Sequence, residues 1–196
     1  MQEKGVPFSA QWVYNTLYIQ KWGNMTLFRK QKKKQRRALR KDESIMTRST
    51  AREIAMHLTF ELAFSDIKVD ELLERELNAD AFAARAVDEP LYAEYPNEEQ
   101  ENYIRTLVRG VAEHGFELDG YIEKHAKGWR FSRIDRVAAA IMRVTMFEIL
   151  YRPDVPNKVA INEAVEIAKG YVDEDVVKFV NGILGSFVRA EFPEQE

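Results

Sequence analysis

The sequence predicts an all-α protein whose main part is a single helical-bundle domain of about six to seven helices. Three observations predict this fold class. Apolar residues recur at the spacing of one helix face along most of residues 46–190. Helix-capping residues and prolines separate these amphipathic stretches. No stretch shows the alternating pattern and turn signal of a β-hairpin. Segments of this kind bury their apolar stripes by packing helix against helix.

The domain opens with a clear helical pattern. Thr50 is a favourable N-cap, and Glu53 three residues later would complete a capping box. The apolar stripe that follows consists of Ala51, Ile54, Ala55, Leu58 and Leu62. Arg48 and Arg52 are four residues apart and therefore project from the same flank of this helix. Two guanidiniums placed there can grip a phosphate or stack on a base, although two ordinary solvated arginines would have the same spacing.

The middle of the domain is less uniform. Residues 78–95 are rich in Ala and acidic residues, have weak periodicity, and are expected to form a partly helical connection. Helical periodicity is clear in Val69–Leu77, from Asn97 to the interrupting Gly115, in Glu117–His125, and from Ser132 to Leu150. Ser132 and Asp135 have the spacing of a capping box for the last of these helices. Pro153 and Pro156 then break the chain.

Residues 156–188 hold two further helical patterns that are joined at an acidic turn. Asp173 is a favourable N-cap, and Asp175 suits the positive end of the helix that follows. Phe179 lies about 100° from the centre of the apolar stripe of this helix, next to the solvent-facing Lys178. A ring at the edge of a polar face is either a peripheral core residue or a platform on which a base stacks.

The charge is distributed unevenly along the 196-residue chain. The formal net charge is −3, but residues 1–45 contain 11 Lys or Arg against 3 Asp or Glu. Residues 46–196 contain 18 basic and 29 acidic residues, which gives them a formal charge of −11. Such a domain lacks a general positive field for nucleic acid, so RNA binding would need a local patch or a basic partner.

The composition predicts a cytoplasmic protein without catalytic chemistry, cofactor or metal. The absence of cysteine excludes disulfides and thiolate metal sites. No apolar run approaches the length of a membrane span, and the N-terminus lacks the apolar run of a secretory signal. The three histidines, His57, His114 and His125, show no metal-ligand spacing, and His57 is expected at the surface. Glu163 and Glu166 share a helix face, but on its solvent side.

Three ordered blocks carry a family resemblance. They are TRSTAREIAMHLTFELAF from Thr47, WRFSRIDRVAAAIMRVTMFEIL from Trp129, and KVAINEAVEIAK followed by KFVNGIL. The second block ends in a pattern formed by Arg143, Glu148 and Ile149. Together the blocks cover most of residues 46–190 and resemble the NusB family of bacterial transcription antitermination factors.

The resemblance implies a small all-helical RNA-binding factor that is not an enzyme. Such factors pair with ribosomal protein S-ten, called NusE in this role, and the pair binds the boxA element of nascent RNA. This activity supports processive transcription, chiefly of ribosomal RNA operons. The residues that the resemblance places at the RNA are Arg48, Arg52, Asp175, Lys178 and Phe179. Other members carry more arginines at the first helix, where this chain has Ser49 and Thr50.

The resemblance also suggests how the parts cooperate. We expect Arg48, Arg52 and Phe179 to form one cationic and aromatic spot where the first helix of the domain meets the last. A basic ribosomal protein would supply the positive field that the acidic domain lacks. The alternative function is a structural or assembly module in ribosome biogenesis with little RNA binding of its own. NusB-like domains also occur fused to RNA cytosine methyltransferases, but this sequence contains no such catalytic domain.

Residues 1–45 differ from the rest, and three interpretations of them stay open. The basic run 29–41 is typical of a nucleic-acid-binding arm, and equally of a solvated, disordered tail. The third interpretation is a mis-assigned start, because the family-like region begins almost at Met46 and Met25 is another possible start. We therefore expect a basic N-terminal extension over residues 1–45 and a helical RNA-binding domain over residues 46–196.

Overall fold

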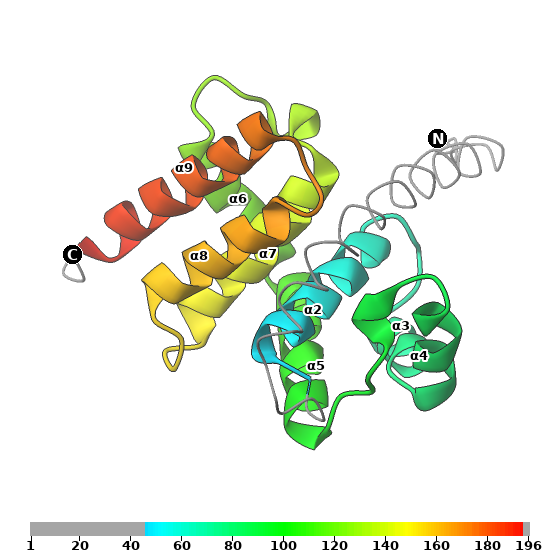
Figure 1. The fold of residues 1–196 in the computed structure, drawn as a ribbon. Helices are drawn as coiled ribbons and strands as arrows, with labels where there is room; N and C mark the ends of the chain where they lie inside the picture. The colour runs from blue at the N-terminus through cyan, green and yellow to red at the C-terminus, as the bar shows by residue number, and fades with distance from the viewer. Residues whose placement is uncertain (1–45, 194–196) are drawn as a thin grey trace, which may run out of the picture. The chain divides into compact units, whose positions relative to one another are not determined.

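The computed structural model describes residues 46–193, which form an all-helical bundle without strands (Figure 1). The α-helices are α2 (Arg48–Leu62), α3 (Val69–Glu76), α4 (Ala79–Ala86), α5 (Glu98–Glu113), α6 (Gly115–His125), α7 (Arg136–Tyr151), α8 (Asn157–Ala168) and α9 (Glu174–Glu191). Two 3-10 helices, η1 (Pro90–Tyr92) and η2 (Phe131–Arg133), lie in connections. The predicted all-α fold is confirmed, and α4 is the helix that the weak pattern of residues 78–95 obscured. The interpretations of residues 1–45 lie outside the described residues.

Helix α7 is the centre of the bundle. It is apolar on nearly all sides, and its interior residues from Val137 to Ile149 are almost all buried. A helix of this kind needs cover in every direction. Helices α2 and α5 pack on one side of α7, and α6, α8 and α9 pack on the other (Figure 1). The small residues Ala138, Ala139 and Ala140 are buried and permit the close approach of neighbouring helices.

The helix starts show which capping predictions were right. Asn97 and Gln100 form the capping box of α5, in which each side chain accepts from the backbone N–H of the other. The predicted cap of the first helix at Thr50 is wrong, because Thr47 caps α2 and accepts from the N–H of Thr50 at 3.1 Å. The predicted capping box of Ser132 and Asp135 is also wrong, because Asp135 is itself the cap of α7 and accepts from the first free backbone N–H groups.

His57 is buried, which corrects the expectation of a surface residue. Its Nδ1 lies 3.1 Å from the hydroxyl of Tyr92, and its Nε2 is hydrogen bonded to the hydroxyl of Tyr171. That hydroxyl in turn donates to Glu53 at 2.7 Å. Periodicity places His57 on a polar flank of α2 but does not reveal that η1 and the α8–α9 connection cover this flank.

No helix among residues 46–193 combines the length and apolar character needed to cross a bilayer.

Gly110 provides a test of how closely α5 and α7 approach. A Cβ at this position would lie 1.9 Å from Cζ of the buried Phe147 ring. We predict that Gly110→Ala lowers the free energy of unfolding by about 1–3 kcal/mol or more, because the ring must move in a packed core. The measurement is urea unfolding of the purified protein.

Gly120→Ala is the matched control, since no atom lies within 4 Å of the added methyl group on α6. Alanine there should stabilise the helix by about 0.5–1 kcal/mol. Equal effects of the two substitutions would contradict the close contact between Gly110 and Phe147.

Candidate nucleic-acid interface

Arg48 lies at the surface where α2 begins. Its side chain is 46% exposed, and its Nη2 donates to Oδ2 of Asp154 at 2.8 Å. Arg152 also donates to Asp154, at 3.1 Å, and the hydrogen bonds from Arg152 and Arg48 lower the pKa of Asp154 to about 2. The guanidinium groups of Arg48 and Arg152 both lie beside the ring of Tyr103. Two arginines therefore share one carboxylate at this corner.

Arg52 lies on the same flank as Arg48, as the spacing predicts, but its side chain is only 3% exposed. Its Nε and Nη2 donate to the two carboxylate oxygens of Glu148, each at 2.8 Å, and its Nη1 lies 3.3 Å from Glu163. Burial alone would lower the pKa of Arg52, but the hydrogen bond and negative charge of Glu148 raise it. The hydroxyl of Tyr103 also donates to Glu148. Arg52 is a structural residue here, and its predicted contact with RNA would require this buried pair to open.

Phe179, Lys178 and Asp175 lie in the first turns of α9. The carboxylate of Asp175 is 98% exposed, and Nζ of Lys178 lies 3.6 Å from it and 3.0 Å from Glu174. The ring of Phe179 is half-buried, and its centroid lies 5.6 Å from that of Trp129. The ring stays outside the buried stripe of α9, in agreement with its position on the helical wheel.

The structure does not join Arg48 and Phe179 in one spot. Arg48 is anchored to the α7–α8 connection through Asp154, whereas Phe179 contacts Trp129 in the connection between α6 and α7. Helix α2 packs mainly on α5 and α7, and α9 packs on α6, α7 and α8. The expectation of a single spot at a junction of the first and last helices is therefore wrong, and the candidate residues form two separate groups.

Trp129, which is exposed, and the neighbouring Arg130 and Arg133 are not among the residues predicted from the sequence to contact RNA. Trp129 is 57% exposed, and the three residues line a surface hollow together with Gly128. The signal available in the sequence was the interleaving of aromatic residues and arginines in GWRFSR. Among residues 46–193, no cluster of His, Cys, Asp or Glu has the size and arrangement to hold a metal ion.

Comparison with known proteins identifies the family. The sequence pattern that defines the NusB family matches residues 49–189, which is most of the chain. The chain belongs to the NusB family. The transcription antitermination protein NusB of Acetivibrio thermocellus is 40% identical over 147 residues, which are 74% of this chain and 91% of that protein. The NusB protein of Bacillus subtilis is 38% identical over 141 residues, covering 72% and 94% of the two chains.

Solved NusB structures share the fold. NusB of T. maritima superposes with a TM-score of 0.62 at 27% identity, over 74% of this chain and 92% of that chain. The solution structure of NusB from Aquifex aeolicus gives a TM-score of 0.56 at 25% identity, over 76% and 92% of the chains. The resemblance inferred from the three sequence blocks is confirmed, and the chain is a transcription antitermination factor of the NusB type, a family without enzymatic activity.

The buried ion pair predicts a large loss of stability when its negative charge is removed. Glu148→Gln keeps the shape of the side chain but removes the main counter-charge of the buried Arg52, which keeps only the longer contact with the partly exposed Glu163. We predict that this change lowers the free energy of unfolding by about 3–5 kcal/mol in urea titrations. The double variant Arg52→Met/Glu148→Leu should recover most of that loss, because it buries no charge.

Asp119→Asn is the matched control for Glu148→Gln. Arg143 also makes a two-pronged contact with Asp119, at 2.7 and 2.8 Å, but this pair is partly exposed. Its loss should cost about 1 kcal/mol or less, because water screens the charges. A similar cost for the two substitutions would show that the Arg52 pair is no more important than an ordinary surface pair.

Proposed function

We propose that this NusB-family protein binds the boxA element of nascent ribosomal RNA transcripts together with ribosomal protein S-ten (NusE). It would act in this way on the transcription elongation complex in the cytoplasm. The observation that carries the proposal is the family match over residues 49–189, since relatives that match nearly their whole length are transcription antitermination proteins. An antitermination factor of this kind holds RNA and carries out no chemistry on it.

The charge of the domain supports the need for a partner. Residues 46–196 have a formal charge of −11, so the phosphates of a free RNA approach a repulsive field. A basic ribosomal protein is attracted by the same field and brings positive charge to the complex. Binding to RNA alone is therefore weak, and binding in the presence of the partner is stronger.

The RNA contacts that we propose are divided between the two groups of residues. Arg48 offers an exposed guanidinium whose contact with Asp154 a phosphate can replace or share. Phe179 offers a half-buried ring on which an unpaired base can stack. The exposed carboxylate of Asp175 can accept from a base amino group, and Lys178 can approach a phosphate. Arg52 contributes indirectly, because its ion pair holds the helix that presents Arg48.

One observation favours the second candidate function, a structural or assembly module with little RNA binding of its own. The predicted cations are all engaged within the protein. Arg52 is buried against Glu148, Arg48 contacts Asp154, and Lys178 lies between two carboxylates. If these contacts persist in the complex, the protein would join an assembly through its acidic surface and would leave the RNA to its partner.

Gel-shift titration with boxA RNA and a scrambled control tests the proposal. The full chain should bind boxA weakly alone and more tightly when S-ten is added, because the partner supplies positive charge. A shorter protein that begins at Met46 should behave in the same way. Loss of all binding in the shorter protein would show that the basic run 29–41 is a functional arm and that the mis-assigned start is the wrong interpretation.

Two single substitutions separate the two candidate functions. Arg48→Gln and Phe179→Ala should each weaken binding of boxA RNA to the complex with S-ten by about tenfold, since they remove a phosphate contact and a stacking ring. The matched controls are Arg109→Gln, whose side chain is 45% exposed and paired with Asp70, and Phe192→Ala at the other end of α9. Unchanged affinity in both test variants would favour the assembly module.

A further inference from the structure

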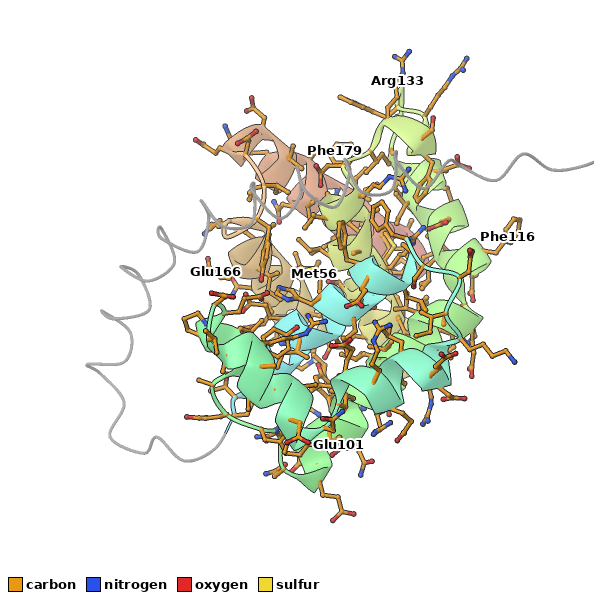
Figure 2. All side chains as sticks on the ribbon, turned by 90° about the vertical axis from the view of Figure 1, so that its right-hand side faces the viewer. Met56, Glu101, Phe116, Arg133, Glu166 and Phe179 are labelled. Carbon is orange, nitrogen blue, oxygen red and sulfur yellow. The ribbon has the colours of Figure 1, made fainter. Side chains whose placement is uncertain are left out.

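The connection between α6 and α7 presents an exposed aromatic and cationic surface that the proposed contacts do not use. We call Trp129, Arg130 and Arg133 the tryptophan patch, which lies beside the ring of Phe179. An indole that is 57% exposed is unusual, because so large an apolar group normally finds cover. Figure 2 shows Phe179 and Arg133 at the same end of the molecule, with the Arg133 side chain extending away from the ribbon.

The arginines of the patch differ from most of those elsewhere in the domain. Arg130 and Arg133 are exposed and have no carboxylate within ion-pair distance among residues 46–193. The arginines with carboxylate partners are Arg48, Arg52, Arg75, Arg85, Arg105, Arg109, Arg143 and Arg152. Most guanidiniums of this acidic domain are therefore neutralised by its own carboxylates. Arg130 and Arg133 are not, so both are available to an external anion.

The shape of the patch suits a nucleotide. Gly128 has a positive φ of 83°, and this turn places Trp129 beside α9. The rings of Trp129 and Phe179 lie 5.6 Å apart at an angle of 57°, so they form neighbouring platforms and not a closed stack. A hollow of about 460 Å³ is lined by Gly128, Trp129, Arg130 and Arg133.

We propose that the tryptophan patch is an additional contact for single-stranded RNA, which takes a nucleotide that flanks those bound at Phe179. A base stacks on Trp129, while Arg130 and Arg133 hold the adjacent phosphates. Aromatic platforms interleaved with unpaired cations are the arrangement by which proteins bind single strands without sequence preference. This inference rests on the proposed RNA contact at Phe179, because continuity with that ring is what favours RNA over an acidic protein segment.

Tryptophan fluorescence gives a direct test in the full chain. The sequence contains three tryptophans, so in the Trp12→Phe/Trp22→Phe variant all tryptophan fluorescence comes from Trp129. This variant is titrated at low salt with boxA RNA alone and with boxA RNA extended by uridines at its 5′ or its 3′ end. We expect one of the extended RNAs to quench Trp129 strongly, since a stacked base lies on the indole, and the unextended RNA to quench it weakly.

Affinity measurements with S-ten present test the contribution of each group. Trp129→Ala should weaken binding of the extended RNA by about tenfold and leave binding of the unextended RNA nearly unchanged. Arg130→Gln/Arg133→Gln should make the slope of log K against log salt shallower by about 0.7 for each phosphate that the protein no longer neutralises. The matched controls are Phe116→Ala, which removes a ring that is 96% exposed on α6, and Arg189→Gln in the last turn of α9.

The outcomes separate the patch from the proposed function. If boxA RNA binds but neither extended RNA quenches Trp129 and the arginine variant binds like the wild type, the patch inference is wrong and the proposed function stands. If boxA RNA does not bind even with S-ten, the proposed function fails, and oligouridine then serves as the probe. Quenching of Trp129 by oligouridine that disappears in the arginine variant supports the patch on its own, and the absence of quenching overturns it.

Discussion

The arrangement of the first half of the domain depends on the buried ion pair between Arg52 and Glu148. Two parallel hydrogen bonds fix the orientation of α2 on α7, and Tyr103 of α5 completes the contact by donating to the same carboxylate. Such a pair adds little net stability over apolar packing, but breaking it leaves a charge without compensation, so alternative registers are costly. The pair thereby determines where Arg48, one turn earlier on α2, reaches the surface beside Tyr103.

The pairing of arginines with carboxylates also determines where an anion can bind. Most arginines of the domain are matched by carboxylates, which suits an acidic protein that must not attract nucleic acid over its whole surface. Two places combine exposed or partly exposed arginines with aromatic side chains. They are the corner where Arg48 and Arg152 share Asp154, and the segment that contains Arg130 and Arg133. At the first place the ring is Tyr103, which is buried beneath the arginines, whereas the second place presents the exposed ring of Trp129.

The sequence predicts the helices well because their apolar stripes have a strong 3.6-residue period, and it predicts Phe179 off the stripe for the same reason. It does not predict the burial of Arg52 and His57, because charged and polar side chains face water by default and the residues that cover these two come from distant helices. The helical wheel correctly places these side chains on the flanks of α2, but it cannot show that residues from other helices cover those flanks. Contact between Phe179 and Trp129 was equally inaccessible, since it depends on the path of the chain after Gly128.

The separation of the candidate contacts has a consequence for how RNA and partner cooperate. No single nucleotide can lie against both Arg48 and Phe179 if one group is anchored at the α7–α8 connection and the other beside the α6–α7 connection. An RNA that reaches both lies along a domain whose residues 46–196 have a formal charge of −11, and this repulsion opposes binding unless a basic partner neutralises the field. If S-ten strengthens RNA binding in this way, thermodynamic linkage requires that RNA strengthens the binding of S-ten by the same factor. Under the proposed function, recognition of the RNA and assembly of the complex are then one coupled equilibrium.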